Sequence, residues 1–234
     1  MPETPKILFE DNHLLVAVKP AGVLSQSDPS GDPDMLTLLK AYLVEKYKKP
    51  GEAYLGLLHR LDRPVRGVMV FAKTSKCASR ISEQIRNRTV RKKYRAIVYG
   101  TFEEKEGEIR SFLRKNARTN LVEVFPDEKS APKDAKACHL EYKIEGQGRI
   151  AGVPVTLLSI LLHTGRSHQI RAQLSSIGHP IVGDRKYGSG PHRFAGDILL
   201  ESYSMELDHP VTKERMAFTL PLSEEEPWNQ FRKE

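Results

Sequence analysis

Strand-like segments outnumber helical ones in this sequence, and the two kinds do not alternate regularly. Apolar and β-branched runs typical of strands lie at 14–18, 57–58, 68–72, 93–100, 155–162, 198–207 and 216–222. A regular alternation of strands and helices would build a parallel, doubly wound sheet, and this chain lacks it. The order of segments therefore predicts an α+β protein with a mixed, mostly antiparallel sheet core and flanking helices and loops.

Helical spacing of apolar residues is found in three stretches. The first helix is expected to begin at Pro33 with Asp32 as its N-cap, and the second to run from about 75 to 88. The third is expected to be capped by Ser167 and to end at Gly178. Their expected buried faces are, in order, Leu36, Leu39, Leu43 and Tyr47; Ala78, Ile81 and Ile85; and Ile170, Leu174 and Ile177.

No internal repeat, low-complexity segment or domain linker is apparent in the sequence. The polar stretch 116–136 is interpreted as a hairpin followed by a loop. We therefore expect one domain over residues 1–234, which is long enough to bury a substantial core.

Cysteine content and hydropathy narrow the class of protein. Cys77 and Cys138 are the only cysteines, and neither belongs to a CxxC pair, so neither a disulfide framework nor a cysteine zinc site is indicated. The apolar run 157–162 is far shorter than the roughly 18 residues of a membrane span, and the first twenty residues do not resemble a secretory signal. The sequence predicts a cytoplasmic protein without a membrane partner, and a monomer.

The chain carries a moderate excess of positive charge, with 37 Lys and Arg against 30 Asp and Glu and a net charge of +7. Part of this charge is concentrated between Arg86 and Arg95, a run that contains no acidic residue and leads into an apolar, aromatic strand pattern. A basic run can simply be a solvated helix end, but its continuation into this strand favours a nucleic-acid surface.

The segment His59–Pro64 combines opposite charges within a short loop between apolar runs. Asp62 lies there between Arg60 and Arg63. One interpretation is a local ion pair that holds the loop. The other is that the flanking cations keep Asp62 ionised and ready to act as a nucleophile or base.

A second polar segment, 163–171, contains two histidines and two arginines. His168 and Arg171 are three residues apart and are expected on the helix face opposite Ile170. The segment could be a capped, solvated helix start, or a cluster of donors that meets a phosphate or pairs with Asp62. A metal bound by His163 and His168 is not favoured, because no third ligand is evident.

In their order along the chain, these segments resemble the RluA family of RNA pseudouridine synthases. The resemblance extends over roughly residues 8 to 222. The matching motifs are an opening turn at Lys19–Gly22, an aspartate signature at His59–Asp62, a tyrosine strand at Lys93–Gly100, and a third motif at Thr164–Arg171 continued by Gly178–Gly188.

The resemblance implies the pseudouridine synthase catalytic fold and a role for each matched residue. Asp62 would be the catalytic carboxylate, and Arg171 would pair with it. Tyr94 would stack on the target base, and Arg60 would fill the gap left by the flipped uridine. No metal and no organic cofactor are implied.

The resemblance also implies an isomerase whose partner is structured RNA, either rRNA or tRNA. Because strand 14–18 already belongs to the catalytic core, no separate N-terminal RNA-binding domain is expected. Two departures from the family pattern, Val65-Arg66 and Gln173, leave these roles intact, although Arg66 can alter RNA contacts. The alternative is a non-catalytic RNA-binding or RNA-folding protein on the same scaffold; a DNA-binding protein is less favoured, because no helix-turn-helix or zinc signature is present.

Overall fold

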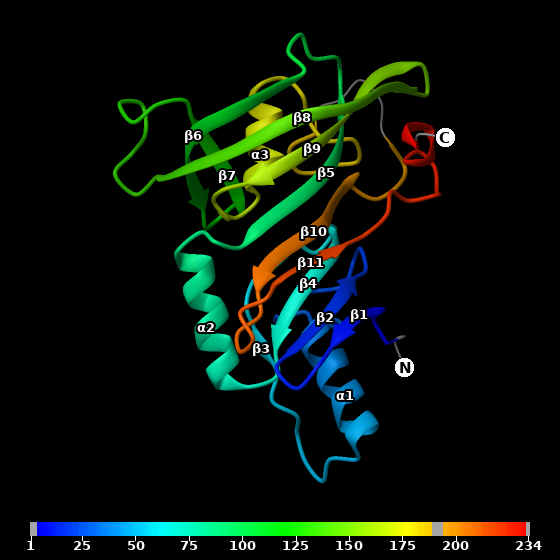
Figure 1. Cartoon of the computed structure of the whole chain (residues 1–234). Helices are drawn as coiled ribbons and strands as arrows, with labels where there is room; N and C mark the ends of the chain where they lie inside the picture. Colours follow the sequence, from blue (N-terminus) through cyan, green and yellow to red (C-terminus); the bar gives the residue numbers. More distant parts are fainter. Residues whose placement is uncertain (1–3, 189–193, 233–234) are drawn as a thin grey trace. The chain divides into compact units, whose positions relative to one another are not determined.

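The computed structural model describes residues 4–188 and 194–232, which form two compact units. The first unit contains the chain up to Arg91 and the segment Ser202–Leu220, and the second contains Lys92–Glu201 and the chain from Pro221 onward. Each unit has its own strands (Figure 1). Each also has its own buried core.

The first unit is built on antiparallel strand pairs. Its strands are β1 (Ile7–Glu10), β2 (Leu14–Lys19), β3 (Gly56–Leu57), β4 (Arg66–Ala72), most of β10 (Leu200–Asp208) and β11 (Arg215–Thr219). They lie in the order β1-β2-β4-β10, with β3 paired to β4 and β11 paired to β10. The helices of this unit are α1 (Met35–Tyr47) and α2 (Ser75–Arg86).

Apolar side chains from β2, β4 and α2 form the core of the first unit together with residues of β10 and β11. The helix α2 buries Ile81, as its apolar spacing predicts, and packs Ala78 and Ile85, both partly buried, against the same core. It also buries Cys77, which was not predicted. The helix α1 begins two residues later than predicted, because Asp34 rather than Asp32 is its N-cap and accepts the backbone N–H of Thr37 at 3.1 Å.

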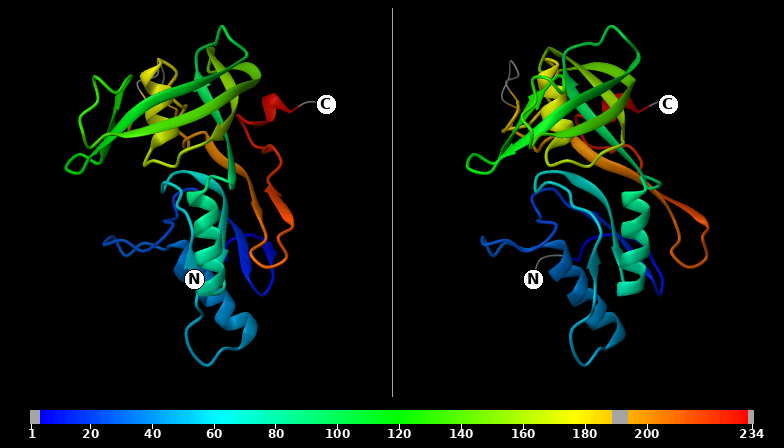
Figure 2. Two further views of the ribbon diagram at one scale, coloured as in Figure 1. Left: turned by 60° about the vertical axis from the view of Figure 1, so that its left-hand side comes forward. Right: turned by 90° about the vertical axis from the view of Figure 1, so that its left-hand side faces the viewer.

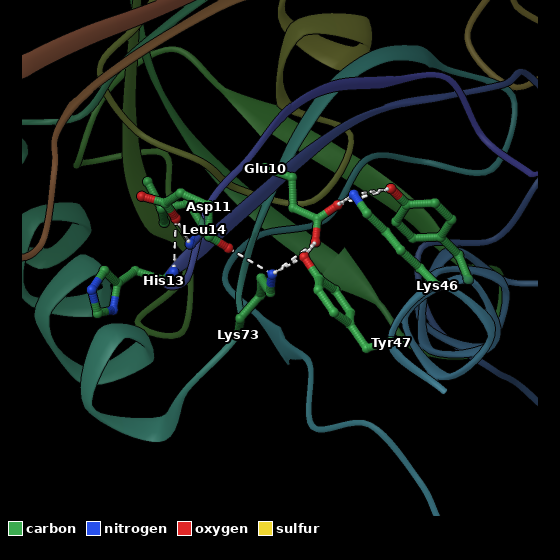
Figure 3. A network of polar contacts seen from close by, with 8 residues as sticks. Glu10, Asp11, His13, Leu14, Lys46, Tyr47 and Lys73 are labelled. Atoms are coloured by element: carbon green, nitrogen blue, oxygen red, sulfur yellow. Dashed lines mark hydrogen bonds and ion pairs between the residues drawn. The ribbon is translucent and has the colours of Figure 1, made fainter. Parts of the chain in front are cut away.

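Glu10, at the end of β1, connects α1 to the sheet of the first unit (Figure 3). Its carboxylate accepts hydrogen bonds from Lys46 and Lys73 at 2.7 Å each and from the hydroxyls of Tyr47 at 2.7 Å and Tyr42 at 2.8 Å. Burial alone would raise the pKa of Glu10, but these donors outweigh it and lower the pKa to about 2. Tyr47 is therefore a polar anchor, 48% exposed, and not the core residue that its spacing predicts.

The second unit is an antiparallel sheet that carries one helix. Its strands lie in the order β5 (Arg91–Tyr99), β9 (Val153–Leu162), β8 (Lys136–Ile150), β6 (Glu106–Asn116) and β7 (Leu121–Phe125). The helix α3 (Gln169–Ser176) contacts β6 and β7 (Figure 2), and a short helical turn, η1 (Asn229–Phe231), contacts β8.

The start of α3 differs from the sequence prediction, whereas Gly178 ends the helix as predicted. The N-cap is His168, in the left-handed conformation (φ 52°) and without a side-chain cap, so Ser167 is not the cap. Ile177 follows the last helical residue and is 42% exposed, because the chain leaves the helix there through Gly178 at φ 85°. The predicted buried stripe is thus confirmed for Ile170 and Leu174 and wrong for Ile177.

The predicted α+β class and antiparallel sheet are confirmed, as is the hairpin and loop at 116–136, where β6 turns into β7. The strands β6 and β8 were not predicted. Every second residue of β8 beyond Leu140 is exposed, so its apolar signal is weak. In the part of the chain that the structure describes, no helix is long and apolar enough to cross a membrane.

Candidate active site

The loop that carries Asp62 lies between β3 and β4 of the first unit, and it is held at several backbone positions. Leu61 and Val65, on either side of Asp62, are buried. The buried hydroxyl of Ser25 donates to the carbonyl of Leu61 at 2.8 Å and accepts its N–H at 3.0 Å. Val65 N–H donates to the carbonyl of Asp62 at 3.0 Å and closes a turn. The backbone around Asp62 is therefore fixed while its side chain is partly exposed.

A fully buried lysine, Lys19, lies beside this loop at the end of β2. Its ammonium donates to the carbonyls of Arg63 and Pro20 at 2.9 Å each and to that of Val23 at 2.5 Å. Burial lowers the pKa of Lys19 to about 7, the Asp62 carboxylate opposes this decrease, and Arg63 adds to it. From the sequence, Lys19 is assigned only to a turn. The signal for its burial is that it directly ends a buried apolar strand.

The two arginines that flank Asp62 have different environments. Arg63 forms an ion pair with Asp32 at 2.8 Å and donates to the carbonyl of Gly22 at 3.0 Å. Arg60 is exposed. The structure therefore gives Arg63 a carboxylate partner other than Asp62, and it leaves Arg60 at the surface.

Gly67 follows the loop at the start of β4 and allows the close approach that the sequence predicts. Its φ is 135°, and a Cβ at this position would collide with the backbone of Ser202 on β10. A side chain here would push β4, the strand that follows the Asp62 loop, away from β10.

Tyr94 belongs to the second unit, on β5, opposite Ile160 of β9. Tyr94, Ala96 and Val98 are buried, as the predicted alternation requires, and Tyr94 is 7% exposed. Ile97, predicted on the other face, is also buried, because both faces of this part of β5 are covered.

Arg171 lies on α3 of the second unit and is buried, not solvated as a helix start would be. Its Nε donates to Oδ2 of Asp184 at 2.8 Å and its Nη2 donates to Oδ1 at 2.7 Å. The sequence analysis gave Asp184 no role, since a lone carboxylate 13 residues from its partner leaves no spacing signal. The predicted pairing of Arg171 with Asp62 joins the two units and stays a prediction.

His163 lies next to His139 and Glu141. The rings of His163 and His139 stack with centroids 4.2 Å apart, and His163 is 2.8 Å from Glu141. One potential ligand atom from each of the three residues lies within 4.8 Å of the others. The imidazole of His139 is 2.9 Å from Glu108, so each of the two imidazoles contacts a carboxylate. This cluster could hold a transition metal, but its present contacts are those of a surface ion-pair network.

Comparison with known proteins agrees with these features. The sequence profile of the family described as RNA pseudouridylate synthase matches residues 13–176. Ribosomal large subunit pseudouridine synthase D of Nitrosomonas europaea is 32% identical over 94% of this chain, which spans 62% of that protein. The tRNA pseudouridine synthase C of Haemophilus influenzae is 30% identical over 96% of this chain and 95% of that protein.

The fold of the chain is also found in a solved structure. Human RNA pseudouridylate synthase domain containing 1 matches 93% of this chain and 83% of its own, with a TM-score of 0.75 and 23% identity. This likeness defines the class, an α+β fold shared with pseudouridylate synthases. From the profile match and the relatives, the chain belongs to the RNA pseudouridylate synthase family, whose members are isomerases acting on RNA.

Proposed function

We propose that this protein isomerises specific uridines to pseudouridine in structured rRNA or tRNA, with Asp62 as its catalytic carboxylate. The observation that carries the proposal is the Asp62 loop, whose backbone is fixed by Ser25 and Lys19 in a chain of this family. Relatives named for the large ribosomal subunit and for tRNA support both RNA classes as substrates.

The reaction needs no oxidant and no transferred group. The N1–C1′ bond of uridine breaks, the uracil turns, and a C5–C1′ bond forms, after which C5 loses a proton and N1 takes one up. Asp62 would either attack C1′ of the ribose or remove a ribose proton to give a glycal. Both routes need an ionised carboxylate in a site from which water is excluded, since water at C1′ would hydrolyse the sugar.

Arg171, Tyr94 and Arg60 complete the proposed site. Arg171 would pair with Asp62 and orient it. Tyr94 would stack on the extruded uracil, and the exposed Arg60 would occupy the gap in the RNA. Extruding a base costs on the order of a few kcal/mol, and stacking on an aromatic ring and on a guanidinium offsets part of this cost.

We propose that both units together form one catalytic domain. The family profile runs from residue 13 in the first unit to residue 176 in the second. A monomer that acts in the cytoplasm, where rRNA and tRNA are found, is part of the same proposal.

The test is tritium release from RNA labelled with 5-³H-uridine and separated into tRNA and rRNA pools. Tritium leaves C5 only when the new C5–C1′ bond forms. We expect wild type to release tritium from at least one pool, and Asp62→Asn to lower the rate by at least about 10⁴-fold, as for removal of a catalytic nucleophile. The RNA affinity of Asp62→Asn should stay within about tenfold of wild type, since only one charge is lost.

Asp28→Asn is the matched control, because it removes an exposed carboxylate of the same unit that is hydrogen-bonded to Ser30. It should release tritium at the wild-type rate. Substantial residual activity in Asp62→Asn would remove Asp62 from its assigned role. Tight RNA binding by wild type without release from either pool would favour the non-catalytic RNA-binding alternative.

A further inference from the structure

A second buried contact of Asp184 limits its freedom to move. Besides the Arg171 fork, Oδ1 of Asp184 accepts the backbone N–H groups of Lys186 at 2.8 Å and Tyr187 at 3.1 Å. Its side chain has no exposed surface. Burial alone would raise the pKa of Asp184, but the contacts with Arg171 and these N–H groups lower it below its usual value. The carboxylate is therefore charged at neutral pH and fixed to the turn that follows it.

Tyr187 lies on another side of the same guanidinium. The guanidinium carbon of Arg171 is 5.3 Å from the centroid of the Tyr187 ring, within the range of a cation–π interaction. The Tyr187 hydroxyl accepts the backbone N–H of Val122 at 2.8 Å and is hydrogen-bonded to Nδ1 of His168, also at 2.8 Å. Contacts to β7 and to the start of α3 thus hold this ring in place.

These contacts fix the orientation of the Arg171 guanidinium more tightly than an ion pair that only stabilises the fold would require. A buried ion pair stabilises a fold no better than apolar side chains of similar volume, because both charges lose their hydration. The Nε–Nη2 fork with Asp184 engages one edge of the guanidinium and sets its plane.

We infer that Asp184 and Tyr187 are positioning residues, which fix the orientation of the Arg171 guanidinium, the group proposed above to pair with Asp62. This inference rests on the proposed function and on the role proposed there for Arg171. Neither Asp184 nor Tyr187 touches the substrate. Each acts through Arg171, so its contribution depends on Arg171 being an arginine.

A double-mutant cycle tests this dependence. Asp184→Asn, Arg171→Lys and the double variant are compared with wild type by tritium release and by thermal melting. We expect Asp184→Asn to lower kcat by about 10–100-fold and to leave the KM for RNA within about threefold, as for a residue that orients a reacting group. In the Arg171→Lys background the same change should cost less than about threefold, since lysine offers no fork to position. Asp197→Asn, an exposed carboxylate of the same unit, is the control and should match wild type.

Additive losses in the cycle would overturn the inference, because a residue that only supports the fold costs the same activity in either background. If Asp184→Asn shows no cooperative melting, Tyr187→Phe and Tyr187→Leu decide instead. Phenylalanine keeps the ring beneath Arg171 and should lose less than about fivefold in kcat, whereas leucine should lose about tenfold or more. Equal activity of these two variants would contradict the role of the ring. Wild type that releases no tritium would overturn the proposed function itself, and the inference with it.

Discussion

Gln173, one of the two departures from the family pattern, forms hydrogen bonds inside the protein through both the nitrogen and the oxygen of its side-chain amide. Its Nε2 donates to the carbonyl of Ile109 at 3.1 Å and to the hydroxyl of Ser111 at 2.9 Å, and its Oε1 accepts from Gln169 at 3.0 Å. Gln173 is fully buried. This side chain therefore joins α3 to β6, which holds the helix that carries Arg171.

Replacing Gln173 with alanine should destabilise the protein. Gln173→Ala leaves the buried groups of Gln169 and Ser111 without this partner, and we expect a loss of about 2–3 kcal/mol in the free energy of unfolding. Urea denaturation measures it. Gln147→Ala, on the exposed side of β8, is the control and should change the free energy by less than about 0.5 kcal/mol. A loss no larger than that of the control would show that the three hydrogen bonds do not stabilise α3.

At the scale of single residues, the sequence predicts side chains that belong to motifs better than side chains that support them. Asp62 and Arg171 belong to dense polar motifs. Asp184 is recognisable only after folding, because it meets its partner across 13 residues. Lys19 ends an apolar strand, but the carbonyl of Arg63 to which it donates is 44 residues away and is not indicated by the sequence. Burial of a charged side chain depends on which distant segments cover it, and no local spacing records that.

At the scale of elements, the attachment of α1 to β1 depends on the charge of Glu10. The folded pKa of about 2 lies below the ordinary value of 4.5, so the stabilisation is complete above pH 4.5 and is lost as the pH falls towards 2. We expect Glu10→Gln to lower the free energy of unfolding at pH 6 by on the order of 2 kcal/mol. The difference from wild type should shrink steadily between pH 4.5 and 2, as measured by urea denaturation across this range.

The control for this prediction is Glu45→Gln, which changes an exposed carboxylate on the same helix. It should leave the pH dependence of the free energy of unfolding like that of wild type. A constant difference between wild type and Glu10→Gln over the whole range would mean that the charge of Glu10 contributes nothing.

Elements with a strong apolar period, such as α2 and β4, were predicted from the sequence, whereas the half-exposed strands β6 and β8 were not.

At the scale of the whole molecule, the net charge of +7 predicts RNA binding that weakens with salt. Phosphate contacts release counterions, so the dissociation constant should rise by about tenfold or more between 50 and 200 mM salt. Arg86, Arg88 and Arg91 are exposed in the first unit. Replacing these three with alanine should reduce the slope of log affinity against log salt by about 2, measured by filter binding. The paired change of Lys48 and Lys49, exposed at the end of α1, is the control, and an equal effect there would contradict an RNA surface at the Arg86–Arg95 run.

The division into two units, each made of two separate chain segments, has a consequence during synthesis on the ribosome. Most of the second unit, Lys92–Glu201, lies in the sequence between the two segments of the first unit. The strand β4 cannot gain its partner β10 until the chain as far as Asp208 has left the exit tunnel, and β10 cannot gain β11 until Thr219 has left it. In the nascent chain, β4, the strand that follows the Asp62 loop, is therefore without its partner β10 until most of the rest of the protein has been synthesised.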